Sequence, residues 1–262
     1  RKALDWLAAK DVNHTYTRAI RANVWEYALR KVPYDEGIRT ALKNDYEWLM
    51  KARHADGVWR YTMESRDWDN SNSQYGVLGI WAAARAGFDP GDDFWKDMSR
   101  HFLGCQCADG GWSYTGNSGS TANMATAGLA SMFLVFDMYH GKSFYQAGGK
   151  RTFSTGEPAE CLKSIERGME WLGKNGLGNQ DSYFLYGIER VGVASGRKYI
   201  GGKDWFKEGA LVALRQQAQN GSIQLGSWGD DVCRTAFSTL FLVYGGAPVA
   251  YYMLEYGKDD DW

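Results

Sequence analysis

Proline is scarce in this chain, with only 4 residues among 262. Because proline removes a backbone hydrogen-bond donor and clashes with the preceding helical turn, a chain so poor in it can form long helices. Strand signals are absent as well. These absences favour an all-α fold, and the 44% of apolar residues allows a sizeable core.

Excess charge of one sign and long apolar runs are also missing. The net charge is -1, with 23% charged residues, so electrostatics give no reason to expect nucleic acid or an anionic membrane surface as a partner. No run of about 18 apolar residues occurs, so we expect no transmembrane helix. The chain starts without methionine and ends at Trp262, which we interpret as a fragment of a longer protein with flanking domains. The compartment stays open.

Cysteine is scarce, whereas aromatic residues and glycine are abundant. The four cysteines form no paired Cys-x-x-Cys framework, and we interpret them as buried free thiols. There are 12 tryptophans, 16 tyrosines and 32 glycines. So many aromatic side chains would either line a pocket or fill the space between helices. The glycines indicate many turns.

A short motif recurs along the chain. It reads R-x-x-D-G-x-W at 53–59 and Q-x-x-D-G-x-W at 106–112. A third, weaker copy reads Q-x-x-N-G-x-I at 217–223, and Asn175-Gly176, midway between the second and third copies, is interpreted as the remnant of another. Asp-Gly can supply the left-handed residue that follows a helix, so each copy predicts a turn.

Each copy lies between two segments that predict helices. The segment before it is amphipathic and is expected on the outside, whereas the segment after it is apolar and is expected to be buried nearly all round. Outer helices are predicted over 38–52, 93–104, 160–174 and 204–217, and inner helices over 73–86, 120–139, 182–194 and 232–244. An earlier pair is predicted over 1–9 and 15–31. The predicted N-caps of the four inner helices are Asn72, Ser120, Asp181 and Asp231.

Outer and inner helices that alternate around a ring form an α/α toroid. We therefore expect a single domain over 1–262, a barrel of about five to six helix pairs. Residues 141–158 interrupt the pattern and are expected to form an exposed insertion. Residues 247–256 are expected to start a further outer helix.

The Gln-x-x-Asp-Gly-x-Trp motif resembles the repeat of the terpenoid cyclase and protein prenyltransferase superfamily, which includes squalene cyclases. Residues 106–112 match it at every specified position, and residues 53–59 depart only at the first. The stretches 68–74 and 110–114 also resemble bacterial proteins with prenyltransferase and squalene-oxidase repeats. The resemblance implies an α/α toroid that binds an apolar, isoprenoid-type small molecule at the barrel mouth. It fixes the architecture better than the chemistry, because one fold hosts many functions.

Asp67-Trp68-Asp69-Asn70 resembles the Asp-x-Asp-Asp motif of class II terpene cyclases, whose middle aspartic acid protonates an alkene or epoxide. The resemblance implies that Asp69 is a catalytic acid and Asp67 its partner, in a dry pocket whose aromatic faces stabilise carbocations. Asn70 replaces the last aspartate. The alternative is structural, with Asp69 or Asn72 as the N-cap of the following helix.

Asp231-Val232-Cys233 resembles the Asp-x-Cys of protein prenyltransferase β-subunits, in which both residues bind zinc. The resemblance implies Asp231 and Cys233 as weak candidate ligands, but a catalytic zinc needs at least three protein ligands. All four histidines precede Asp231, and His14 would reach it only if the ring closes. We therefore expect no cofactor, with zinc as the open alternative. The structural interpretation is an N-cap aspartate and a core cysteine.

Aromatic residues gather after the motif and near the starts of the inner helices. They would line a cavity for a polyprenyl chain, stack on sugar rings, or simply pack between helices. The candidate ligand-binding residues are Trp59, Trp68, Tyr75, Trp112, Tyr114, Trp228 and Asp231, with Tyr61 and Tyr183 in the same set.

Two main classes of function stay open. In one, the toroid binds an apolar ligand, with acid chemistry at Asp69 or prenyl transfer. In the other it is a non-catalytic module for protein or carbohydrate recognition in a larger bacterial protein, which the incomplete motifs favour. A carbohydrate-active barrel, with Asp69 opposite Asp230 or Asp231, is a third. Thioester chemistry, found on the same toroid, is excluded because Cys-Gly-Glu-Gln is absent.

Overall fold

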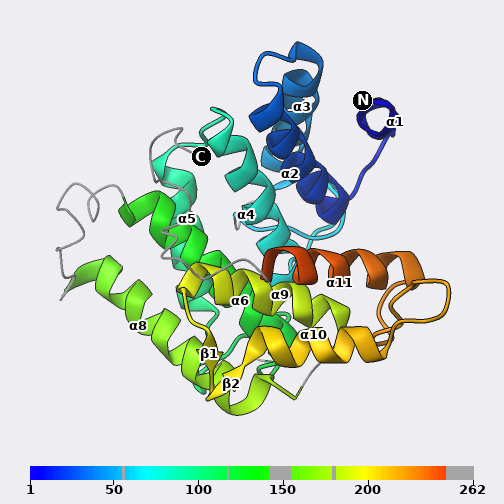
Figure 1. Ribbon diagram of the computed structural model, residues 1–262. Coiled ribbons are helices and arrows are strands. Elements are labelled where there is room, and N and C mark those ends of the chain that lie inside the picture. The colour runs from blue at the N-terminus through cyan, green and yellow to red at the C-terminus, as the bar shows by residue number, and fades with distance from the viewer. Residues whose placement is uncertain (55–56, 117, 142–154, 179–180, 246–262) are drawn as a thin grey trace. The chain divides into compact units, whose positions relative to one another are not determined.

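The computed structural model describes residues 1–54, 57–116, 118–141, 155–178 and 181–245 (Figure 1). α-Helices dominate these residues, so the predicted all-α class is confirmed. Backbone contacts divide the chain into two compact units, Arg1–Gly104 with Leu134–Arg151 and Cys105–Phe133 with Thr152–Trp262. The closure of the helix pairs into one ring stays a prediction.

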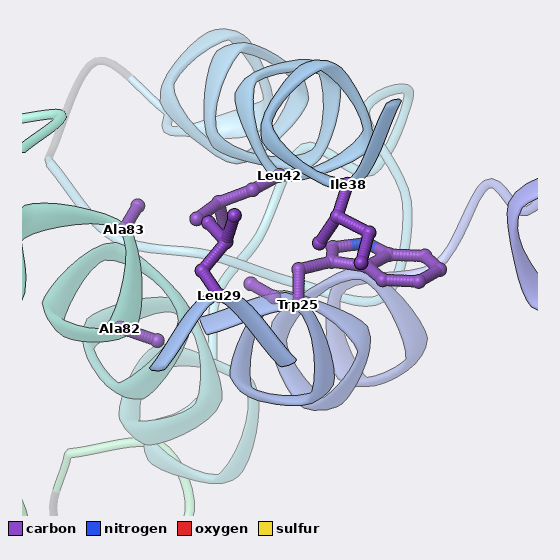
Figure 2. Packing of buried hydrophobic residues seen from close by; sticks show 7 residues of the cluster. Trp25, Leu29, Ile38, Leu42, Ala82 and Ala83 are labelled. Atoms are coloured by element: carbon purple, nitrogen blue, oxygen red, sulfur yellow. The ribbon is translucent and has the colours of Figure 1, made fainter. Parts of the chain in front are cut away.

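The core of the first unit lies where three helices meet (Figure 2). Trp25 and Leu29 of α2 pack with Ile38 and Leu42 of α3, and the small residue Ala82 lets α4 approach. The helices of this unit are α1 (Lys2–Ala8), α2 (Thr15–Lys31), α3 (Glu36–Ala52), α4 (Asn70–Arg85), α5 (Asp92–Gly104) and the π-helical turn η1 (Asp137–Gly141). As predicted, the inner helix α4 is buried over most of its length, while α3 and α5 are amphipathic.

The second unit is helical except for one hairpin among its described residues. Its elements are α6 (Ala122–Phe136), α8 (Gly156–Trp171), the π-helical turn η2 (Leu172–Gly176), α9 (Ser182–Ser195), β1 (Tyr199–Ile200), β2 (Lys203–Asp204), α10 (Trp205–Arg215) and α11 (Asp231–Gly245). The last residues of α6, from Leu134, belong to the first unit. The strands pair antiparallel around Gly201-Gly202, whose positive φ values of 56° and 78° suit a two-residue hairpin. No strand signal in the sequence predicted this hairpin.

All three copies of the motif form the same turn. The N–H of the turn glycine donates to the carbonyl three residues earlier, from Gly57 to His54, from Gly110 to Cys107 and from Gly221 to Ala218. The three glycines have φ values of 81°, 96° and 85°. This left-handed conformation is the one that Asp-Gly and Asn-Gly predicted.

The first residue of the motif fixes this turn and, in the first two copies, reaches the next outer helix. Its side chain donates to the carbonyl of the turn glycine in every copy, from Arg53 Nε (2.7 Å), Gln106 Nε2 (2.9 Å) and Gln217 Nε2 (3.2 Å). Gln106 also donates to the carbonyl of Ser164 on α8 (2.9 Å), and Arg53 Nη2 donates to Asp97 on α5 (3.0 Å). We call these contacts the motif bridge. Arginine forms it in the first copy as glutamine does in the second.

Asn175-Gly176 does not form such a turn. Both residues lie in η2, where Gly176 is buried against Leu172 and is not among the glycines with positive φ. The interpretation of this dipeptide as a remnant of the motif is therefore wrong. The outer helix instead continues through a π-helical turn.

The expected insertion ends earlier than predicted. Helix α8 begins at Gly156, so the boundary at 158 falls inside a helix. Pro158 is tolerated there because the first-turn N–H groups of a helix need no intrahelical acceptor. Residues 142–154 and the predicted helix start at 247–256 lie outside the described residues.

One of the four predicted N-caps is confirmed and three are displaced. Asp181 caps α9 and accepts from the N–H of Phe184 (2.7 Å). In the other helices the cap is Asp69 rather than Asn72, Thr121 rather than Ser120, and Asp230 rather than Asp231. In each case several polar residues follow one another, and the backbone geometry selects one of them.

The tryptophans of the motif pack onto glycines of the following inner helices. Trp59 lies over Gly76 of α4, and Trp112 lies over Gly128 of α6, so closely that a β-carbon on either glycine would overlap the indole ring. Both tryptophans are fully buried. The motif tryptophan and the helical glycine therefore act as a complementary pair.

We expect Gly128→Ala to lower the free energy of unfolding by about 2 kcal/mol, because its methyl group displaces the Trp112 ring or the helix. Urea denaturation measures the change. Gly104→Ala is a matched helical control, since no atom lies within 4 Å of its added β-carbon. It should be neutral or stabilising by up to about 1 kcal/mol. Equal effects of the two substitutions would contradict the packing argument.

Candidate functional site

Asp69, the predicted catalytic acid, is the N-cap of α4. Its carboxylate has no exposed surface. Oδ1 accepts from the backbone N–H of Asn72 (2.6 Å), and Oδ2 accepts from the side-chain amide of Asn72 (2.9 Å) and from Nη1 of Arg60. The bond from the Asn72 N–H is the N-cap contact that the structural interpretation predicted.

This environment bears on the acid hypothesis. The donors to Asp69 are N–H groups, one of them on an arginine, and such donors are the partners of a carboxylate. To donate a proton to a substrate, Asp69 would first have to be protonated, and it would then lose its hydrogen bond from Arg60 or from the Asn72 side chain. Asp67 is exposed, with Oδ1 3.5 Å from Nε of Arg60. The catalytic roles of both aspartates stay predictions.

The next residue of this motif, Asn70, contacts a half-buried histidine. Its Oδ1 lies 2.9 Å from Nε2 of His101 on α5, and the His101 ring packs edge-on against Trp68 with centroids 4.8 Å apart. Burial lowers the pKa of His101 to about 4. His101 is therefore neutral at pH 7.

The candidate aromatic residues fall into two groups. Trp59, Trp112 and Tyr75 have no exposed surface and belong to the core, and Trp68 is half-buried. Tyr114 and Trp228 are 41% and 44% exposed, and so available to a ligand. For the buried members the packing interpretation explains the residue without a ligand.

Tyr61 is a partly exposed member of an aromatic cluster in the first unit. Its backbone carbonyl accepts from the N–H of Thr15 at the start of α2 (2.9 Å), which fixes its position. Its ring lies 5.4 Å from that of His14 and 6.3 Å from that of Tyr16, and Tyr16 packs on the buried Tyr75 at 4.1 Å. Tyr61 is 39% exposed, and Arg60 lies over its ring at 5.1 Å. We call Tyr61 and these neighbours the Tyr61 cluster.

A second cluster lies beside the start of α9. Trp228 packs against Tyr183 (5.2 Å) and Phe237 of α11 (5.6 Å). Tyr186 packs on the same phenylalanine at 5.2 Å. The sequence indicated Trp228 because it follows the third motif turn, and Tyr183 because it follows the N-cap Asp181. No motif indicated Phe237 or Tyr186.

The candidate zinc residues do not form a metal site in the described part of the chain. Asp231 pairs with Arg234 at 2.5 Å. Although Cys233 is largely exposed, partial desolvation and then the contact with Asp230 raise the pKa of its thiol, which opposes the thiolate that zinc requires. No group of three or more His, Cys, Asp or Glu side chains there could hold a metal ion. His14 lies in the other unit, beside Tyr61.

All four cysteines are free, as predicted, but their expected burial is wrong for three of them. Only Cys161 is buried, Cys105 and Cys107 are half-buried, and Cys233 is exposed. Cys233 is therefore not the core residue of the structural interpretation. It lies at the start of α11, where the helix is open to solvent. The pairing of Asp69 with Asp230 or Asp231 spans the two units and stays a prediction.

Glu189 of α9 is a buried carboxyl group that the sequence analysis missed. Burial raises its pKa to about 7, while Arg190 opposes the shift. Burial also raises the pKa of Tyr186, one helical turn earlier. The Glu-Arg dipeptide gives no signal, because successive helical residues point in different directions and packing decides which is buried.

Comparison with known proteins leaves the family open. No family model matches the chain, and a search of curated proteins gave no significant match. Within the described residues, no helix combines the length and apolar character needed to cross a membrane.

Proposed function

We propose that this chain is a non-catalytic binding module built from the helix pairs of a terpenoid cyclase-like α/α toroid. The shared turn, the motif bridge and the Trp–Gly pairs support this architecture. Each repeats one relation between an outer helix, a turn and an inner helix, as repeat architectures do. The ligand is an apolar small molecule of the isoprenoid class.

The observation that carries the binding role is the matched position of Tyr61 and Tyr114. Each lies four residues after a turn glycine, and they are 39% and 41% exposed, although the tryptophan two residues before each is fully buried. The third copy has the buried Leu225 at this position and the exposed Trp228 three residues later. The repeat thus supplies an exposed aromatic face close to the start of successive inner helices.

The Tyr61 cluster is the best defined of these faces. A tyrosine whose backbone is fixed and whose ring rests on other rings offers an apolar surface at little cost in conformational entropy. Acid chemistry at Asp69 is no part of the proposal, because its carboxylate is engaged by Arg60 and Asn72.

Titration calorimetry with farnesol tests the proposal. We expect saturable binding that Tyr61→Ala weakens by about fivefold, since an aromatic contact contributes on the order of 1 kcal/mol. Tyr34→Ala, which removes a tyrosine that is 93% exposed between α2 and α3, is the matched control and should bind as the wild type does.

Absence of saturable farnesol binding would overturn the ligand class, and equal losses in both variants would overturn the site. A parallel titration with a β-glucan oligosaccharide separates the carbohydrate-recognition alternative. Oligosaccharide binding that depends on Tyr61, without farnesol binding, would favour that alternative.

A further inference from the structure

An open groove lies in the first unit between the first motif turn and α5. Its volume is about 560 Å³, and its lining residues are Met50, Arg53, His54, Gly57, Asp97, Arg100 and His101. A volume of this size suits a small-molecule ligand. Two arginines face one aspartate, so the fixed charge of the lining is positive.

Several polar groups in the groove have no hydrogen-bond partner among the described residues. Arg100 Nη1 lies 3.9 Å from Asp97, which is beyond hydrogen-bonding distance. His54 Nε2 is buried and has no hydrogen-bond partner, an uncommon state that costs free energy. Arg53 uses Nε and Nη2 in the motif bridge and keeps Nη1. An anion with several oxygen atoms offers acceptors to the two arginines and to His54 in its Nε2–H tautomer.

The second copy of the motif lacks the features that form this groove. Its turn glycine, Gly110, lies against α8, since a β-carbon there would be 2.9 Å from the carbonyl oxygen of Arg167. A β-carbon on Gly57 would instead meet the guanidinium of Arg53. Where the first copy has Arg53 and His54, the second has glutamine and cysteine. The basic lining is therefore particular to the first copy.

We propose that this groove binds a phosphate-type oxyanion, with Arg100 and Nη1 of Arg53 as charged donors and His54, in the tautomer that carries its proton on Nε2, as a further donor. Planar guanidinium groups match the oxygens of a phosphate, and charge-assisted hydrogen bonds are the strong ones. His101 adds a neutral imidazole to the lining and no charge. The proposal rests on groups other than the Tyr61 cluster and is tested separately from it.

Titration calorimetry of the full chain with inorganic phosphate, at an ionic strength held constant with potassium chloride, tests this site. We expect saturable binding that Arg100→Ala and Arg53→Gln each weaken by about tenfold or more. Arg53→Gln restores the glutamine of the motif and can keep the bond to Gly57, so its fold is expected to persist, as circular dichroism would show. Lys51→Ala, exposed on α3 outside the groove, is the matched control and should bind phosphate as the wild type does.

The other outcomes are equally informative. Tighter binding of pyrophosphate with the same dependence on Arg100 would support the site and identify a diphosphate ester as the better ligand class. Acetate binding as tight as that of phosphate would overturn the phosphate assignment. Absence of saturable binding, or an equal loss in Lys51→Ala, would overturn the site.

Discussion

Asp45→Ala is expected to lower the free energy of unfolding by about 3–5 kcal/mol. The carboxylate of Asp45 has no exposed surface. Oδ1 accepts from Arg18 Nη1 (2.8 Å) and Arg21 Nη2 (2.5 Å), and Oδ2 accepts from Arg21 Nε (2.7 Å) and Trp25 Nε1 (2.8 Å). Removing the carboxylate leaves two guanidinium groups without their counter-charge, and that of Arg21 is buried. An uncompensated buried charge is the costly case.

The loss should extend to the segment that joins α1 to α2. Arg21 Nη1 donates to the carbonyl of Lys10, and Arg18 Nε donates to that of Val12, both at 2.8 Å. Asp45 positions these two arginines, and the arginines in turn fix the segment. Urea denaturation measures the global loss, and amide hydrogen exchange over 7–12 measures the local one.

The matched control lies on the same helix. Glu47 faces Lys43 at 3.7 Å with both side chains more than half exposed, so Glu47→Ala should cost less than about 1 kcal/mol. A loss from Asp45→Ala as small as that would show that the two arginines find water or other acceptors. The cluster would then contribute little to stability.

Glu189→Gln is expected to raise the free energy of unfolding at pH 8 by about 3 kcal/mol and to leave it nearly unchanged at pH 4. The folded pKa of about 7 lies above the ordinary value of 4.5. Between these values the folded chain keeps a proton that the unfolded chain has lost. The stability that this group contributes is therefore complete below pH 4.5 and is lost as the pH rises to 7. Each pH unit in this interval is worth about 1.4 kcal/mol.

Urea denaturation of the wild type and of Glu189→Gln, measured at about one-unit intervals from pH 4 to 8, checks the sign of this pH dependence. The charged and titratable groups near Glu189 include Arg190, which opposes the shift, and Tyr186, whose own pKa is raised by burial. Glu166→Gln, on an exposed position of α8, is the control and should show no such pH dependence. A flat difference between wild type and Glu189→Gln would mean that water or Arg190 solvates the carboxylate.

The positions of the helices were predictable because the signals for them are local. Amphipathic and apolar segments recur with a fixed relation to the Asp-Gly turn. Within the described residues, each predicted helix is found with its ends moved by a few residues. The displaced caps show where local signals fail. Between Asp67 and Ser73 nearly every residue can cap a helix, and only the approach of Arg60 and the fold of the turn select Asp69.

Side-chain partnerships were not predictable from local pattern. Asn70 contacts His101, and Tyr16 packs near Tyr61, although the sequence around one residue of each pair does not indicate the other. The sequence around Glu189 likewise does not indicate that its side chain is buried. The resemblance suggested an acid at Asp69, yet its motif lies where a helix cap is also needed. One of the groove's charged donors, Nη1 of Arg53, arises from the one departure of the first copy from the motif.

The motif bridge has a consequence for how relatives of this chain diverge. In the second copy, Gln106 reaches a main-chain carbonyl of α8, which every amino acid at that position would supply. The residue of that outer helix at the contact can therefore change while the motif at the turn is conserved. In the first copy, Arg53 reaches the side chain of Asp97, so the two positions constrain each other. Among relatives we expect arginine at 53 to appear together with an acidic residue at 97, and glutamine at 53 to appear with any residue there.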